Sequence, residues 1–250
     1  MERKDFLRGL GLVGLGSLAI PMINSCSKDN EDSSSGSGTD SSTDSGSGGS
    51  SGSCTVTPSE TAGPFPTKVP ASLVSSNIVS DRTGVAFTMK IYIKNTNASC
   101  AALAGALVDV WHCDKDGYYS EYGGTSMQQA DFTSVHFLRG RQTTDTNGLV
   151  LFTSIFPGWY QGRATHIHVH IYNASGKSLL VTQIAFPEGT GSAVALVNAS
   201  TANGYTKGLN GYTYNATDNV FSDSVSEEMS TITGSVADGY VLTHTINVAG

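Results

Sequence analysis

The sequence predicts an all-β fold for residues 54–250, an antiparallel-rich β-sandwich with long loops. No stretch in this region shows a long apolar pattern with the 3.6-residue period of an amphipathic helix. Short runs rich in β-branched and aromatic residues alternate instead with turn sequences, such as Asp-Thr-Asn-Gly at 145–148. Many short strands separated by turns are typical of a sandwich.

Six runs carry the strand signals. In the first of them, Val85, Phe87, Met89, Ile91 and Ile93 recur at every second position, which places them on one face of a strand. In order along the chain, the predicted strands are 85–93, 106–113, 149–155, 166–172, 178–186 and 240–248. Residues 188–235 are rich in Asn, Thr, Ser and Gly, and we expect long loops there with one short helix near 224–229.

The first fifth of the chain predicts export. Residues 1–25 combine a charged start with an apolar stretch at 9–20, which is the layout of a signal peptide. The apolar stretch is too short to span a membrane as a stable helix. Arg3 and Lys4 stand where a twin-arginine signal has its Arg pair. The run Ile-Asn-Ser-Cys that ends at Cys26 is similar to a bacterial lipobox, in which the Cys becomes the lipidated first residue. The alternative is an ordinary signal peptide followed by a chance Cys.

Residues 26–53 are expected to join the lipid-attachment Cys to the folded domain at 54–250. They consist almost entirely of Ser, Gly, Asp, Thr, Asn and Glu, which cannot build a core, so we expect a disordered tether. A flexible coil of this length reaches roughly 30 Å root-mean-square. The sequence therefore predicts an exported lipoprotein that meets the membrane only through its lipid anchor and faces the periplasm or the cell surface.

Composition bears on the binding partners, the size and the possible disulfides of the domain. The chain carries a net charge of -7 at pH 7, which argues against nucleic-acid binding. Residues 54–250 are enough for one domain with a sizeable core. In an exported protein, Cys54, Cys100 and Cys113 allow one disulfide and one spare thiol, and the sequence does not choose the pair.

A histidine-rich strand gives the strongest sign of chemistry. Three of the six histidines, His166, His168 and His170, alternate with Ile and Val shortly after Tyr160 and Arg163. Residues two apart in a strand point to the same face, roughly 6–7 Å from each other. Two imidazoles at that spacing can converge on one metal ion. The alternative is a solvated edge strand that happens to carry histidines, but the neighbouring Arg and Tyr favour the metal site.

Five segments follow one another in an order found in one enzyme family. They are TPSETAGPF at 57–65, WHCDKDGYYS at 111–120, FLRGRQTTD at 137–145, PGWY at 157–160 and RATHIH at 163–168. In these segments the chain resembles the intradiol ring-cleavage dioxygenases, the catechol and protocatechuate 3,4-dioxygenase family, and the match runs from about residue 55 to Phe186. Each motif alone is weak, whereas five in sequence are specific. The resemblance implies a β-sandwich of the protocatechuate 3,4-dioxygenase type.

The resemblance also implies non-haem Fe(III) held by Tyr119, Tyr160, His166 and His168, with a solvent hydroxide completing the coordination. Fe(III) is a hard cation that favours anionic oxygen ligands, and imidazole also suits iron. A bound trivalent cation favours the tyrosinate form of a side chain whose ordinary pKa is about 10. Tyr118 is the alternative to Tyr119, but the family spacing of Gly, one residue and then Tyr favours Tyr119.

The reaction implied by the resemblance uses a small-molecule catechol and O2. The catechol binds iron as its dianion and displaces Tyr160, which takes up a proton, and ring cleavage gives a cis,cis-muconate-type diacid. Arg163 matches a family Arg that stabilises negative charge on the substrate, and Gln183 matches a Gln that orients it. Only Gln161 and Gly162 separate Tyr160 from Arg163, fewer residues than in the characterised enzymes. We therefore expect a wider pocket mouth, unless another segment within 188–220 closes it.

Two other functions are consistent with parts of this pattern. A non-catalytic β-sandwich module could keep the fold and the metal site to bind a polyphenol or a carbohydrate, but a pure binder has no use for Arg163. A zinc or copper site could use the histidine pair alone, without the red-brown colour that two iron-bound tyrosinates give. The remaining polar and aromatic residues near the motifs are expected in packing, ion pairs or the surface: Trp111, His112, Arg139, Arg141 and His170.

Overall fold

The computed structural model describes residues 54–223 and 225–250. These residues belong to one compact unit. The predicted signal peptide at 1–25, Cys26 and the tether up to residue 53 lie outside the described residues, so export and lipid anchoring stay predictions. Among the described residues, no helix has the length and apolar character that a membrane crossing requires.

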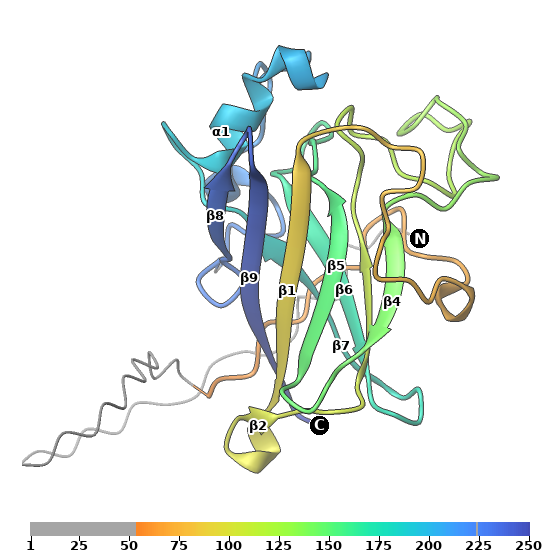
Figure 1. Ribbon diagram of the computed structural model, residues 1–250, viewed down its shortest axis with the longest axis vertical. Helices are drawn as coiled ribbons and strands as arrows, with labels where there is room; N and C mark the ends of the chain where they lie inside the picture. The colour runs from red at the N-terminus through yellow and green to blue at the C-terminus, as the bar shows by residue number, and fades with distance from the viewer. Residues whose placement is uncertain (1–53, 224) are drawn as a thin grey trace, which may run out of the picture. The chain divides into compact units, whose positions relative to one another are not determined.

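Strands form most of the regular structure in this part of the chain, and they make two sheets (Figure 1). The strands are β1 (Ala86–Asn95), β2 (Ala101–Ala102), β3 (Leu107–Trp111), β4 (Arg139–Thr143), β5 (Leu149–Ile155), β6 (His166–Tyr172), β7 (Ser178–Ala185), β8 (Thr231–Ser235) and β9 (Gly239–Val248). The helical elements are α1 (Ala193–Asn198) and the 3-10 turns Pro70–Ser72, Thr96–Ala98, Thr201–Asn203 and Asn215–Thr217. The predicted all-β sandwich is confirmed.

The first sheet has the order β2-β1-β9-β8, and β5 also pairs with β1. β1 and β9 run parallel, whereas the other pairs in this sheet are antiparallel. Alternate side chains of β1, among them Phe87, Met89 and Ile91, are buried in the core. This alternation is the period of two that the sequence shows, because successive side chains of a strand point to opposite faces.

The second sheet has the order β4-β3-β6-β7 and is antiparallel throughout. Ile167, Val169 and Ile171 of β6 belong to the hydrophobic core together with side chains of β1 and β9. His166 and His168 alternate with these residues, so they point to the outer face of the sheet. Both histidines are nevertheless buried, since loops and the start of the domain cover this end of the sheet.

All six predicted strands are present, and none of their ends is displaced by more than two residues. The sequence does not predict β2, β4 and β8. β4 contains Arg139 and Arg141 and lacks an apolar alternation, and it forms a strand because it pairs along its whole length with β3. Such tertiary pairing overrides local propensity in sheets.

The prediction of a short helix near 224–229 is wrong. The Ala185 N–H donates to the Glu228 carbonyl, and the Ser230 N–H donates to the Ala185 carbonyl. These bonds commit the backbone around Met229 to a bridge with the end of β7. The short helix is α1 instead, where the Ser192 side chain accepts from a backbone N–H in the first turn, as an N-cap residue does.

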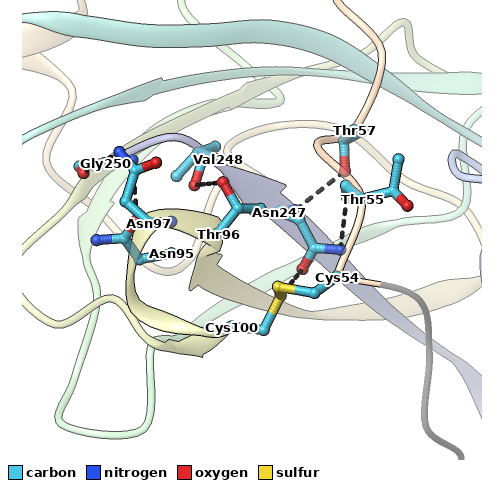
Figure 2. Close-up of a disulfide and its surroundings, with 10 residues drawn as sticks. All are labelled: Cys54, Thr55, Thr57, Asn95, Thr96, Asn97, Cys100, Asn247, Val248 and Gly250. Carbon is cyan, nitrogen blue, oxygen red and sulfur yellow. Dashed lines mark hydrogen bonds between the residues drawn. A yellow bond between two sulfur atoms is a disulfide. The ribbon is translucent and has the colours of Figure 1, made fainter.

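A disulfide joins Cys54 to Cys100, with Cα atoms 5.7 Å apart (Figure 2). The pairing that the sequence leaves open is thereby resolved, and Cys113 is a buried free thiol. Close by, the Thr57 N–H donates to the Asn247 carbonyl at 3.0 Å, and the Asn247 N–H donates to Thr57 Oγ1 at 3.0 Å. The start of the domain is therefore fixed to the end of β9 before it continues towards the second sheet.

Candidate metal centre

Two loops that each carry a tyrosine are in close contact. A Cβ atom on Gly158 would lie 2.4 Å from the Lys115 carbonyl oxygen, and one on Gly117 would lie 2.4 Å from the Trp159 carbonyl oxygen. Both positions need glycine for this backbone approach, and Gly117 also has a φ of 93°. The contact brings the rings of Tyr119 and Tyr160 to a centroid distance of 5.7 Å.

β6 supplies two imidazoles to the same place. His166 Nε2 and His168 Nε2 lie 3.1 Å apart. His166 Nδ1 lies 2.6 Å from the Ala164 carbonyl oxygen. A carbonyl oxygen can only accept, so Nδ1 carries the proton and Nε2 presents a lone pair. Trp111 stacks on His168 with centroids 4.9 Å apart and planes 2° apart, which fixes the orientation of that ring.

Tyr119 is the tyrosine that reaches the histidines. Its side chain is fully buried, its hydroxyl lies 3.3 Å from His166 Nε2, and Phe65 stacks on its ring at 4.9 Å. The Gln128 side chain accepts from the Tyr119 N–H and donates to the Tyr119 carbonyl, both at 2.7 Å. Tyr118, the alternative from the sequence, is 38% exposed and packs near Phe132. The structure brings Tyr119, and not Tyr118, into the cluster.

Tyr160 and Arg163 border the same cluster. The Tyr160 ring meets the His166 ring edge-on at a centroid distance of 5.7 Å. Arg163 Nη1 donates to the Tyr160 hydroxyl at 3.5 Å, a long contact. The two residues are thus neighbours in space as well as in the sequence, as the resemblance implies.

Arg163 is held by two further side chains. Its Nη2 donates to Gln183 Oε1 at 2.6 Å, and Gln183 Nε2 donates to the Thr61 carbonyl at 2.8 Å. Its Nε donates to the two carboxylate oxygens of Asp218 at 3.0 and 2.9 Å. The sequence reasoning identified Gln183 by resemblance but missed Asp218, which lies 55 residues from Arg163 in a polar stretch without a readable pattern.

Burial sets the protonation of the cluster. It is the main reason why the pKa values of His166 and His168 lie well below the ordinary value, and the Arg163 charge lowers both further. Both imidazoles are therefore neutral at pH 7, the form that binds a metal. Burial raises the pKa of Tyr119 well above its ordinary value, and it also raises that of Tyr160, against the opposing effect of Arg163. Both phenols are therefore protonated at pH 7 unless a metal ion binds them.

These donor atoms fit a hard metal ion. Two ligand bonds of about 2.1 Å that enclose an angle of about 90–110° place their donor atoms about 3.0–3.4 Å apart. Tyr119 Oη, His166 Nε2 and His168 Nε2 meet this condition, with successive separations of 3.3 and 3.1 Å. The described residues hold no suitable group of three or more His, Cys, Asp or Glu, so the phenols are needed to complete the set. Phenolate oxygen with imidazole nitrogen suits Fe(III).

Other residues near the motifs do not join the cluster. His112 is buried, its ring nitrogens lie 2.8 Å from the Cys113 carbonyl and from the Ser154 hydroxyl, and burial lowers its pKa to about 4. His170, farther along the same face of β6, contacts the Ser178 hydroxyl at 2.8 Å. Arg139 and Arg141 form ion pairs with Glu121 and Asp109, as expected.

A cavity of about 480 Å³ opens beside Tyr160 and Arg163. Gln161 and Gly162, the short connection between these two residues, are part of its lining. Asn219 and Val220 line it as well, so a segment at the end of the 188–220 stretch supplies part of its wall. Among the lining residues Arg163 alone carries a charge, and Pro64, Met127 and Val220 are apolar.

Comparisons with known proteins point to one enzyme family. A family model described as Dioxygenase (Dioxygenase_C) matches residues 71–206, a range that contains all the predicted site residues. A chlorocatechol 1,2-dioxygenase from Rhodococcus opacus is 30% identical over 109 residues, which are 36% of this chain and 40% of that protein. The match therefore spans less than half the length of this relative.

Solved structures extend the likeness over the domain. An intradiol ring-cleavage dioxygenase from Tetranychus urticae superposes with a TM-score of 0.68 at 27% identity, with 78% of this chain and 95% of that chain covered. The dioxygenase domain of a dioxygenase carbohydrate-binding protein fusion from Streptomyces sp. SirexAA-E superposes with a TM-score of 0.53 at 26% identity. That comparison covers 77% of this chain and 97% of the other.

Proposed function

Since the chain belongs to the intradiol ring-cleavage dioxygenase family, we propose that it uses non-haem Fe(III) and O2 to cleave a catechol-type ring. Cleavage between the two hydroxyl-bearing carbons gives a cis,cis-muconate-type diacid. The observation that carries the proposal is the convergence of Tyr119, His166 and His168 beside Tyr160 and Arg163. Intradiol dioxygenases generally use Fe(III), and the donor set fits that ion.

The two tyrosines have different roles in this proposal. Tyr119, Tyr160, His166 and His168 would hold the iron, which when bound acts as a Lewis acid on a chelated catechol dianion. Tyr119 is enclosed, whereas Tyr160 lines the cavity and is only partly buried. An incoming catechol therefore reaches Tyr160 first. Tyr160 is the phenolate that can move aside and accept a proton from a substrate hydroxyl.

Arg163 stabilises the negative charge that develops on the substrate. Its Nη1 faces Tyr160 at the cavity, while its Nε and Nη2 are taken by Asp218 and Gln183. A donor fixed in this way does not have to reorganise during the reaction, which makes its charge effective. The Arg163 side chain is only 7% exposed, so water screens its charge little.

The ligand assignment predicts the colour of the protein. Iron-loaded protein should carry about one iron per chain and be red-brown, because tyrosinates bound to Fe(III) absorb visible light. Tyr119→Phe and Tyr160→Phe should each weaken or shift the visible band, since each removes one tyrosinate. Tyr118→Phe is the matched control and should keep the band. Absorption spectra at equal iron content check this, and an unchanged band in both ligand variants would refute the assignment.

The cavity predicts broad tolerance for ring substituents. A substituent meets the apolar side chains of Pro64, Met127 and Val220 in a cavity large enough for it. A contact that excludes or fits one methylene changes discrimination by about 1–3 kcal/mol, or roughly 10–200-fold. Because the cavity has room for the substituent, we expect less than this, with a bulky 4-alkylcatechol cleaved within about tenfold of catechol. Protocatechuate should not be preferred, because Arg163 is the one charge on the lining and is already ion-paired.

Oxygen uptake with catechol, a 4-alkylcatechol and protocatechuate tests both the activity and its range. The comparison of kcat/KM among the three on iron-loaded protein decides the second point. Strong selectivity for one compact substrate would show that the wall formed by Asn219 and Val220 closes more tightly than the cavity indicates. No uptake with any catechol would contradict the proposed function itself.

A further inference from the structure

Asp218 is a fully buried carboxylate whose oxygens are completely occupied. Both oxygens accept from Arg163 Nε, at 3.0 and 2.9 Å. In addition, Oδ2 accepts from the Ala164 N–H at 2.6 Å, and Oδ1 accepts from the Val220 N–H at 2.8 Å. One side chain thereby binds three groups: the Arg163 guanidinium, the Ala164 N–H just before β6, and the Val220 N–H in the wall of the cavity.

These contacts leave Arg163 a single orientation. Asp218 takes the Nε edge and Gln183 takes Nη2, so Nη1 remains for the cavity side, where it meets the Tyr160 hydroxyl. Phe221 adds a face contact, with its ring centroid 5.6 Å from the guanidinium carbon. A guanidinium has a rigid planar fork, so fixing two of its edges fixes the third.

The same segment continues as the wall of the cavity. Asn219 and Val220 line it, and the Phe221 ring lies 6.4 Å from the His166 ring. The turn before Asp218 is itself held, because Asn215 Nδ2 donates to the Phe186 carbonyl at 2.9 Å. Any shift of Asp218 would therefore move the arginine and the wall together.

We propose that Asp218 is a positioning residue of this site. It orients Arg163 towards the substrate and holds the wall formed by Asn219 and Val220 at a fixed position relative to Arg163. The inference rests on the proposed function, since it concerns the same reaction. Asp218 lies outside the range 71–206 that the family model matches. Its contacts with Arg163, Ala164 and Val220 support this role.

A double-mutant cycle on the full chain tests whether Asp218 acts through Arg163. Asp218→Asn keeps the shape and removes the charge, and it should lower kcat for catechol about 10- to 100-fold, as small misplacements of reacting groups do. KM should change much less. Arg163→Gln should lower kcat further, and the double variant should be no slower than Arg163→Gln alone. Residues that act as one unit are non-additive in this way.

Asp109→Asn is the matched control for the loss of a buried ion pair. Asp109 is 3% exposed and binds Arg141 through both carboxylate oxygens, outside the cavity. This variant should keep kcat and KM. If Asp218→Asn and Arg163→Gln lower kcat by independent factors that multiply, or if Asp218→Asn behaves like Asp109→Asn, the proposal is overturned.

A measurement on the wild-type chain keeps the proposal testable if Asp218→Asn does not fold. The Arg163 Nε–H should exchange with solvent far more slowly in NMR spectra than that of Arg82, whose partner Asp81 is exposed. Exchange as fast as that of Arg82 would overturn the positioning role. This readout needs no turnover, so it is distinct from the absence of catechol cleavage, which would overturn the proposed function.

Discussion

Replacing His168 with alanine is expected to abolish iron binding and with it the colour and the activity. His168 Nε2 lies 3.1 Å from His166 Nε2, and the two nitrogens supply half of the candidate ligands. Removing only a residue that hydrogen-bonds to a metal ligand weakens metal affinity about 10–100-fold. Removing the ligand itself should weaken the affinity more. Iron analysis of purified protein, together with the visible spectrum, checks the result.

His170→Ala is the control for this change. His170 lies two residues further on the same face of β6 and contacts Ser178 and Tyr172 outside the cluster. It should keep its iron and its colour. Because both side chains lie on the outer face of the sheet, neither change opens a hole in the core around Ile167 and Val169. A His168→Ala variant with full iron content would contradict the ligand set.

Arg163→Gln is expected to lower kcat about 10²–10³-fold, the usual effect of removing one preorganised donor. Iron content and the colour of the resting protein should remain, because Arg163 is not among the proposed ligands. The change also leaves Asp218 buried without its partner, which typically destabilises a protein by about 3–5 kcal/mol. Steady-state kinetics and thermal unfolding measured on the same sample separate the two effects.

The double variant Arg163→Gln with Asp218→Asn distinguishes a catalytic from a structural loss. It removes both charges, so much of the lost unfolding free energy should return while kcat stays low. Arg141→Gln, which breaks the ion pair with Asp109 elsewhere on the second sheet, should keep kcat. Arg163→Gln with more than about a tenth of the wild-type kcat would contradict the role of Arg163, since a lost donor costs more.

The strands that the sequence predicts accurately are those whose pattern is local. β5 and β6 have the predicted ends because a turn precedes each of them and buried side chains recur within them. β4 has no such pattern. Its Arg139 is buried, and it is satisfied there by hydrogen bonds to the Phe65 carbonyl and to Ser120, two residues that are distant in the sequence. The pairing of Cys54 with Cys100 likewise depends on where β9 holds the start of the domain.

The candidate site shows the same division. A period of two places His166 and His168 on one face, and this could be derived from the residues alone. The choice of Tyr119 over Tyr118 and the role of Gln183 came from resemblance to a family. Asp218 could not be found either way, because only the folded chain brings it to Arg163. The stacking of Trp111 on His168 was expected only as packing, although it orients a candidate ligand.

The most direct test of intradiol cleavage by this protein follows the oxygen atoms. Iron-loaded protein is given catechol and ¹⁸O-labelled O2, and the products are analysed by mass spectrometry while O2 uptake is recorded. We expect a ring-opened cis,cis-muconate-type diacid that contains both labelled oxygen atoms, with one O2 consumed for each ring cleaved. Oxygen consumption that yields a quinone and peroxide without ring opening, or no consumption by protein with full iron content, would contradict this expectation.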